Sequence, residues 1–356
     1  IVIYVLLGSV VTAIFGADVL NALASNSLFN LIFFLILVVF AISFLGAFEI
    51  TLPSSWSTKI DAQADRSGFI GIFFMALALA IVSFSCTGPI VGSLLVQAAS
   101  QGGIAPIMGM FGFSLAIALP FALFAAFPGW LHSLPKSGGW MNTVKVVLGF
   151  IELGLALKFL SKADLVSKIF LLKRELFIAL WIIITLGLVL YLFGLIRFPH
   201  DNKNEKISNG RKVFGLLSIG FLVYLVQGLV PSERPKLSLL SGILPPLNVS
   251  YFYDEKDGIL GMHPAHDFFE AMEIAKKENK PVLLDFTGYG CENCRKMEEF
   301  VWSEPDILPI LQNELILASL YVDDKEPLPE AEQTKIDIGG GQMKKIKTIG
   351  DKWSMF

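Results

Sequence analysis

The chain has 356 residues, of which 54% are hydrophobic and 17% charged, and its net charge at pH 7 is −3. Soluble domains carry about 25% charged residues, whereas this chain has no Asp, Glu, Lys or Arg between Arg66 and Lys136. Together with a mean hydropathy of +0.65, this composition excludes a purely soluble protein. The lack of a Lys/Arg-rich stripe argues against nucleic-acid binding.

Seven apolar segments are long enough to cross a bilayer, whose hydrocarbon core requires about 20 residues of helix. They are predicted to be helical because lipid cannot satisfy the polar groups of an exposed backbone. The segments are 1–20, 28–52, 69–97, 104–128, 143–160, 176–196 and 213–230. The sequence therefore predicts a polytopic α-helical membrane domain over residues 1–230.

The Lys and Arg residues of the connections predict which side of the membrane each connection faces. One side carries eight of them and the other six. The eight are Lys59, Arg66, Lys136, Arg197, Lys203, Lys206, Arg211 and Lys212, and the six are Lys162, Lys168, Lys173, Arg174, Arg234 and Lys236. By the positive-inside rule the first side is cytoplasmic, so the chain after about residue 231 is expected outside the cytoplasm.

The remaining third of the chain has the composition of a linker followed by a soluble domain. Four prolines in residues 231–260 predict the linker. Next, "HDFFEAMEIAKKENK" predicts an amphipathic helix and "PVLLDFTG" a buried strand, "CENCRKMEEFVW" begins a second helix, and "LILASLYVDD" is a second strand. The apolar face of the first helix is expected to hold Phe268, Phe269, Met272 and Ile274. This order predicts a partial thioredoxin-like α/β domain over residues 261–356.

Cys291 and Cys294 form a C-x-x-C pair at the start of the predicted second helix. A helix N-terminus offers unpaired N–H groups and positive potential, which lower the pKa of the first sulfur. We predict Cys291 as the nucleophile and Cys294 as the resolving thiol of a redox-active dithiol. The alternative is half of a zinc site, but there is no second C-x-x-C, and His263 and His266 lie well upstream.

Two carboxylates accompany this dithiol in the sequence. Asp285 lies on the predicted strand, where a buried carboxylate behind the dithiol would accept a proton from the resolving thiol. Glu298 lies one helical turn after Cys294 and can tune the same pKa. The alternatives are a strand-end aspartate facing water and a solvated helix residue.

The third cysteine, Cys86, lies within an apolar segment and is followed directly by Thr87-Gly88-Pro89. Most membrane cysteines are small buried hydrophobes, and that interpretation applies here too. However, Gly and Pro break a membrane helix where its backbone lines a cavity, and Pro120 would kink the next segment. A cysteine at such a break can be reached from both sides of the membrane, which makes Cys86 a second redox candidate.

Four ionisable residues lie in or near the predicted membrane segments, namely Asp18, Glu49, Glu152 and Lys158. Ionisable groups in lipid are functional candidates by default. All four lie near segment ends, so we expect their side chains to reach the membrane interface.

These motifs resemble the DsbD family of membrane thiol:disulfide interchange proteins. "VLLDFTGYGCENCRKMEEFVW" is similar to the family's C-terminal thioredoxin-like domain, with Tyr289 where thioredoxin folds commonly have tryptophan. "FSCTGPIVGSLL" is similar to the segment around the family's second membrane cysteine, and "FEITLPSSW" and "LPKSGGWMNTVKVVLGFIELGLALKFLS" fit as well. The seven segments match the family's second to eighth membrane helices. The first helix and part of the C-terminal domain are therefore expected to lie outside this sequence.

The resemblance implies a protein-disulfide reductase of the bacterial inner membrane, with its thioredoxin-like domain in the periplasm. Cytoplasmic thioredoxin would reduce Cys86 and its partner cysteine, which would reduce the Cys291–Cys294 disulfide. The acceptors would be a periplasmic disulfide isomerase or cytochrome c maturation thiol proteins. The redox cysteines would need no cofactor, and the remaining implied site residues are Asp285 and Glu298.

Two other functions remain open from the sequence. Broken helices and intramembrane polar residues also occur in transporters, so the chain can be a transporter with an appended thioredoxin-like binding module. A transporter would tolerate loss of Cys86, whereas an electron carrier would not. A chaperone-like docking module is the second alternative, and the intact dithiol with Asp285 behind it argues against that role.

Overall fold

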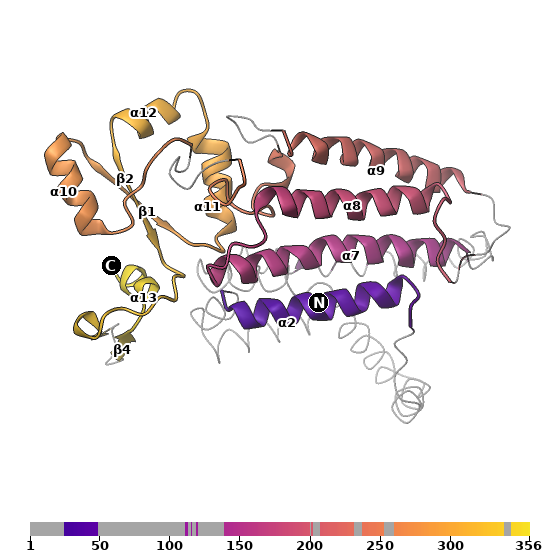
Figure 1. The fold of residues 1–356 in the computed structure, drawn as a ribbon, viewed down its shortest axis with the longest axis horizontal. Helices are drawn as coiled ribbons and strands as arrows, with labels where there is room; N and C mark the ends of the chain where they lie inside the picture. The colour runs from indigo at the N-terminus through magenta and orange to yellow at the C-terminus, as the bar shows by residue number, and fades with distance from the viewer. Residues whose placement is uncertain are drawn as a thin grey trace. The chain divides into compact units, whose positions relative to one another are not determined.

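The computed structural model describes residues 25–48, 111–112, 115, 119, 139–199, 201, 207–230, 237–252, 260–337 and 343–356 (Figure 1). The chain divides into two compact units, and residues 25–36, 153–197 and 206–356 belong to the second unit. The predicted segments 1–20 and 69–97, with Cys86, lie outside the described residues, as do Asp18, Glu49 and Pro120. The second unit contains both the C-x-x-C pair and the helix ends that surround it.

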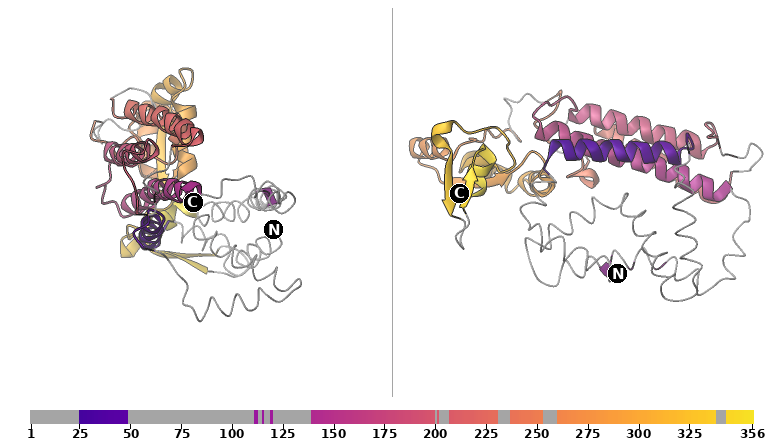
Figure 2. Two further views of the ribbon diagram at one scale, coloured as in Figure 1. Left: turned by 90° about the vertical axis from the view of Figure 1, so that its right-hand side faces the viewer. Right: turned by 90° about the horizontal axis from the view of Figure 1, so that it is seen from below.

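Four long helices are described: α2 (Ser27–Phe44), α7 (Gly139–Val166), α8 (Arg174–Leu192) and α9 (Asn209–Gln227). Within the described part of the chain, α2, α8 and α9 are long and apolar enough to cross a membrane. Helix α9 begins four residues before the predicted segment, because Ser208 caps it by accepting a hydrogen bond from the Arg211 N–H. Helices α8 and α9 lie side by side, as Figures 1 and 2 show.

The surfaces of these helices fit a lipid environment. Large apolar side chains are exposed along them, including Leu35 on α2, Ile183 on α8 and Leu217 on α9, which are 53%, 63% and 66% exposed. Contiguous exposed apolar surface of this kind is rare on soluble monomers and marks membrane or protein contact. The membrane setting inferred from composition is therefore confirmed.

A buried apolar cluster joins α8 and α9 to the stretch that follows them. The short 3-10 turn η1 (Ser238–Leu240) belongs to this stretch, which lies inside the predicted linker. The buried members of the cluster are Leu172, Phe177, Ile178, Leu225, Leu237, Leu240 and Leu244. Each buried leucine-sized side chain contributes about 1.5–3 kcal/mol of transfer free energy, so residues 237–244 are anchored to the helix pair.

The thioredoxin-like part begins with α10 (Phe268–Glu278), β1 (Val282–Thr287) and α11 (Glu292–Met297). A π-helical turn, η3 (Glu298–Trp302), continues α11, and α12 (Leu308–Asn313) and β2 (Ile316–Tyr321) follow. Strands β1 and β2 pair in parallel, with Asp285 opposite Ser319. The predicted order of helix, strand, C-x-x-C helix and strand is confirmed.

The chain then forms a short turn, η4 (Glu330–Glu332), and an antiparallel hairpin of β3 (Thr334–Asp337) and β4 (Met343–Ile346). Helix α13 (Ile349–Ser354) follows, with a capping box between Thr348 and Asp351. It packs beside β2, and Gly350 lies directly against backbone atoms of the segment after that strand. A Cβ at Gly350 would lie 2.6 Å from the Val322 carbonyl oxygen, so this position requires glycine.

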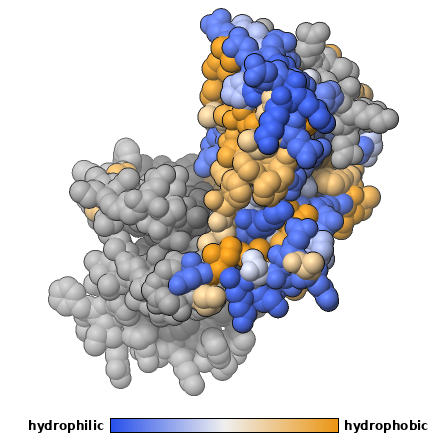
Figure 3. All heavy atoms as spheres, turned by 90° about the vertical axis from the view of Figure 1, so that its left-hand side faces the viewer, coloured by the Kyte–Doolittle hydropathy of each residue, from blue (hydrophilic) through white to orange (hydrophobic). Residues whose placement is uncertain are grey.

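Two details of the sequence prediction are wrong. Strand β1 is not fully buried, because Leu284 and Phe286 on one face are 37% and 48% exposed. On α10, Ala271 and Ala275 are buried and the predicted Ile274 packs against the same cluster, whereas Phe269 is 61% exposed and does not belong to the buried face. Small residues allow α10 to approach the sheet closely, which leaves this aromatic ring outside the contact. Figure 3 shows hydrophilic and apolar patches side by side on this end of the second unit.

Candidate redox site

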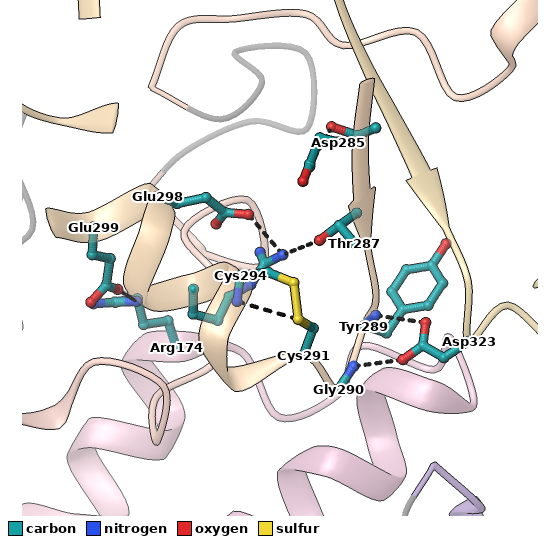
Figure 4. A network of polar contacts seen from close by, with 12 residues as sticks. Arg174, Asp285, Thr287, Tyr289, Gly290, Cys291, Cys294, Glu298, Glu299 and Asp323 are labelled. Carbon is teal, nitrogen blue, oxygen red and sulfur yellow. Dashed lines mark hydrogen bonds and ion pairs between the residues drawn. A yellow bond between two sulfur atoms is a disulfide. The ribbon is translucent and has the colours of Figure 1, made fainter. Parts of the chain in front are cut away.

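The dithiol lies where β1 ends and α11 begins. Cys291 is the N-cap residue of α11, and its sulfur accepts a hydrogen bond from the Cys294 N–H at 3.2 Å. The two cysteines form a disulfide, with their Cα atoms 5.4 Å apart (Figure 4). A sulfur that accepts a backbone N–H at a helix start is favoured as a thiolate. The disulfide is the state expected of a redox dithiol rather than of two zinc ligands.

Asp323, in the segment after β2, holds the loop that leads to Cys291. Its two carboxylate oxygens accept hydrogen bonds from the backbone N–H groups of Tyr289 and Gly290, both at 2.9 Å (Figure 4). A Cβ at Gly288 would lie 2.7 Å from the same carboxylate, so the loop can approach it only with glycine there. Sequence reasoning missed this residue. The signal in the sequence was the acidic pair Asp323-Asp324 at the end of "LILASLYVDD", the second predicted strand.

Arg295 and Glu298 are buried together behind the disulfide. Arg295 is 5% exposed and donates to the Thr287 hydroxyl at 3.1 Å, and it forms an ion pair with Glu298 at 2.8 Å. Glu298 is 2% exposed, so the alternative of a solvated helix residue is wrong. Burial raises the pKa of the Glu298 carboxyl to about 7, Arg295 opposes that rise, and Asp285 and Glu299 add to it. This carboxyl therefore exchanges its proton near neutral pH.

Asp285 lies on β1 and is half-buried. Its carboxylate accepts a hydrogen bond from the Ser319 hydroxyl at 3.2 Å, across the parallel strand pair. Burial raises the pKa of the Asp285 carboxyl, while the Ser319 hydrogen bond and the charge of Arg295 oppose that rise. The structure thus places a partly desolvated carboxyl here, rather than a strand-end aspartate facing water.

An aromatic group covers the loop before the dithiol. Tyr289 stacks on Tyr321, with ring centroids 4.4 Å apart, and Phe170 contacts it from the α7–α8 connection at 6.3 Å. Lys168 lies 5.5 Å from the Tyr289 ring centroid. Burial raises the pKa of the Tyr289 hydroxyl and raises that of Tyr321 to about 12. Both phenols are therefore neutral at physiological pH, and a shielding role of Tyr289 over the dithiol stays a prediction.

Residues 158–174 are here called the α7–α8 corner. Basic side chains of this corner form ion pairs with the thioredoxin-like part. Lys158 contacts Glu292 at 2.5 Å, and Lys168 contacts both Asp324 and Glu326 at 2.8 Å. Although burial opposes it, hydrogen bonds to these two carboxylates raise the pKa of Lys168. Lys158 thus pairs with a carboxylate next to Cys291, and its place at the membrane interface stays a prediction.

The most buried of these pairs joins Arg174, the first residue of α8, to Glu299 of η3. The two side chains are 8% and 4% exposed and lie 3.0 Å apart (Figure 4). Arg174 also donates to the Pro245 carbonyl oxygen at 2.8 Å. The same π-helical turn therefore contacts the dithiol helix through Glu298 and α8 through Glu299. Such turns often occur at functional sites.

Glu152, the remaining intramembrane candidate that the structure describes, lies in the other compact unit. It is 6% exposed, and neither of its carboxylate oxygens has a hydrogen-bond partner among the described residues. Its position at the membrane interface therefore stays a prediction.

Two family models match the chain. One is described as the cytochrome C biogenesis protein transmembrane domain and matches residues 1–163, and the other is described as thioredoxin-like and matches residues 263–337. Together they describe a membrane protein that carries a thioredoxin-like dithiol domain, which is also the class that the helices and the disulfide define.

The chain is also similar to curated proteins. The chain is 24% identical over 350 residues to the thiol:disulfide interchange protein DsbD of Campylobacter jejuni, covering 96% of this chain and 53% of that relative. It is 26% identical over 286 residues to DsbD of Pseudoalteromonas atlantica and 28% identical over 279 residues to DsbD of Neisseria meningitidis serogroup B. These alignments cover 78% and 76% of this chain and 44% and 43% of the relatives. The chain is thus similar to DsbD proteins over most of its length, and it spans about half the length of these relatives.

Proposed function

We propose that this protein is a protein-disulfide reductase that carries electrons across the bacterial inner membrane to the Cys291–Cys294 disulfide. The observation that carries this proposal is the disulfide itself, which lies at the start of α11 with Arg295 and Glu298 buried behind it. The family, the apolar helices and the thioredoxin-like fold support a membrane relay between thiol proteins.

The transfer consists of two rounds of thiol–disulfide exchange. Thioredoxin on the cytoplasmic side reduces a membrane disulfide formed by Cys86 and a second cysteine. The membrane dithiol then attacks Cys291, forms a mixed disulfide and displaces Cys294, and its second thiol resolves that intermediate. Each round moves two electrons and two protons, so the donor becomes a disulfide and the acceptor a dithiol. The exchange requires no metal, nucleotide or flavin.

The two carboxyl groups behind the dithiol serve as proton carriers in this scheme. Displaced Cys294 must take up a proton on reduction and lose one when Cys291 attacks the next partner. Glu298 exchanges its proton near neutral pH, and Asp285 has a raised pKa for the same physical reason. Reduced Cys291 then passes the electrons to a periplasmic disulfide isomerase or to a cytochrome c maturation thiol protein.

The connections support the proposed orientation. Helix α7 leads into the α7–α8 corner, and the stretch after α9 returns to the same end of the α8–α9 pair. Four of the six basic residues on that side, Lys162, Lys168, Lys173 and Arg174, lie in or beside the corner that faces the acidic residues of the thioredoxin-like part. The contact with the acidic residues accounts for these four basic residues on this side. The excess of basic residues on the opposite side therefore supports that side as cytoplasmic.

The test is the redox state of Cys291–Cys294 in growing cells, measured by trapping thiols with a mass-shifting alkylating reagent. We expect a reduced dithiol in the parent and an oxidised one in Cys86→Ala, with the neighbouring Ser85→Ala as the matched control. An unchanged redox state in Cys86→Ala would contradict the relay. That outcome would favour a transporter with an appended thioredoxin-like module.

A further inference from the structure

A small pocket lies beside the disulfide on the side of the α7–α8 corner. Its wall includes Lys158, Ser161 and Lys162 of α7, and Gly290, Cys291 and Glu292 of the dithiol segment. The pocket therefore combines the predicted nucleophile with two cations from a helix outside the thioredoxin-like fold. Neither cation belongs to the C-x-x-C motif or to its accompanying carboxylates.

Lys162 reaches the dithiol loop directly. A Cβ at Gly290 would lie 2.8 Å from Cε of Lys162, so the residue before Cys291 touches the lysine stem. Lys162 forms no direct ion pair or hydrogen bond with the described residues. Burial lowers the pKa of the Lys162 ammonium and the charge of Lys158 lowers it further, while Glu292 and Asp323 oppose this at longer range. The charge is thus held in the pocket without a partner in contact.

The other charged and titratable groups around Cys291 already have partners. Lys158 neutralises Glu292 and Arg295 pairs with Glu298. The Asp323 carboxylate accepts two backbone N–H groups, and Tyr289 is a neutral phenol stacked on Tyr321. Among the described residues around the pocket, Lys162 is therefore the cation left to balance a new negative charge.

We propose that Lys162 is a positioning residue for this reaction, which stabilises the thiolate of Cys291 when the disulfide opens. The proposal rests on the function proposed above. When the donor's second thiolate resolves the mixed disulfide, the bond between the donor sulfur and Cys291 breaks. Its electron pair passes to Cys291, and the donor is left as a disulfide. The leaving thiolate then faces the Lys162 ammonium, and a better stabilised thiolate leaves faster.

Because Lys162 belongs to α7, this stabilisation exists only while the thioredoxin-like part contacts the α7–α8 corner. A charge that the fold itself carried would act equally in every position of the domain. The dithiol is therefore most easily reduced where it contacts the membrane part. When the domain leaves this contact to bind its acceptor, Lys162 no longer stabilises the Cys291 thiolate.

The test measures the alkylation rate of Cys291 by iodoacetamide as a function of pH, in the full chain in membrane vesicles. Cys86→Ser and Cys294→Ser leave Cys291 as the single thiol of these 356 residues, and any cysteine outside them is replaced by serine as well. An opposite charge within reach shifts a pKa by about 1–3 units, so Lys162→Met should slow alkylation about tenfold or more below the Cys291 pKa. Lys162→Arg keeps the charge and should remain close to the parent rate. Lys276→Met removes an exposed lysine on α10 and should leave the rate unchanged.

A further variant separates this effect from misfolding. Glu292→Gln frees Lys158 and should shift the Cys291 profile to lower pH, whereas unfolding would move the thiol toward its ordinary pKa of about 8.5. The proposal is overturned if Lys162→Met keeps the parent profile, or if Lys162→Arg or Lys276→Met shifts it equally. The relay is tested separately. If the redox state of Cys291–Cys294 does not depend on Cys86, the relay is wrong, but the alkylation profiles of Cys291 still test the role of Lys162.

Discussion

The two sides of the Cys291–Cys294 disulfide differ in charge and in origin. Behind it lie Arg295, Glu298 and Asp285, all supplied by the thioredoxin-like part, and one carboxyl there exchanges its proton near neutral pH. In front of it lies a pocket that Arg295 also lines, and two further cations of this pocket, Lys158 and Lys162, are supplied by α7. Proton transfer is therefore built into the domain, whereas stabilisation of the nucleophile's charge depends on contact with the membrane part.

The largest effect that this difference predicts is an asymmetry between the two cysteines. Cys294→Ser should accumulate mixed disulfides through Cys291, because the resolving thiol is gone, whereas Cys291→Ser should accumulate none. Non-reducing gel electrophoresis of alkylated membranes measures both variants. Equal trapping by both variants would show that the assignment of nucleophile and resolving thiol is wrong.

The Arg174–Glu299 pair tests how firmly the α7–α8 corner holds the thioredoxin-like part. Removing one partner of a buried ion pair leaves an uncompensated charge and costs about 3–5 kcal/mol. Arg174→Met should therefore lower the thermal unfolding temperature of the detergent-solubilised chain more than the double variant Arg174→Met/Glu299→Gln does. Lys212→Met, an exposed charge on α9, is the control. If the double variant is less stable than Arg174→Met, the unpaired charge of Glu299 is not what destabilises the single variant.

Glu298 gives the next largest effect, which depends on pH. Its pKa is raised from 4.5 to about 7, so its contribution to stability is fully present below pH 4.5 and is lost as pH rises through 7. A shift of this size corresponds to roughly 3 kcal/mol. Glu298→Gln, which stays neutral, should flatten the fall in stability between these pH values, whereas the exposed Glu273→Gln should not. A pH profile unchanged by Glu298→Gln would mean that this carboxyl does not titrate in that range.

The smallest effect concerns the loop that Asp323 holds. Asp323→Ala removes the acceptor of two backbone N–H groups and should cost about 1–3 kcal/mol. The amides of Tyr289 and Gly290 should then exchange hydrogen faster, while the exposed Asp306→Ala should leave them protected. Unchanged protection in Asp323→Ala would show that the loop is held by other contacts.

The sequence predicted those features that depend on local patterns. Apolar length predicted the helices, and the C-x-x-C with its flanking strand predicted the position of the disulfide. What it missed depends on contacts between distant segments. Asp323 lies 33 residues from Gly290 along the chain, and Glu299 lies 125 residues from Arg174. Likewise, the sequence does not show that Glu292 lies opposite Lys158.

Electron transfer across the membrane is the central claim, and inside-out membrane vesicles test it most directly. Reduced thioredoxin, added to the outside of such vesicles, reaches only the side that faced the cytoplasm. We predict that the Cys291–Cys294 disulfide inside the vesicles becomes reduced, and that Cys86→Ala abolishes this reduction while Ser85→Ala does not. A disulfide that stays oxidised in the parent, or one reduced equally without Cys86, would contradict the account.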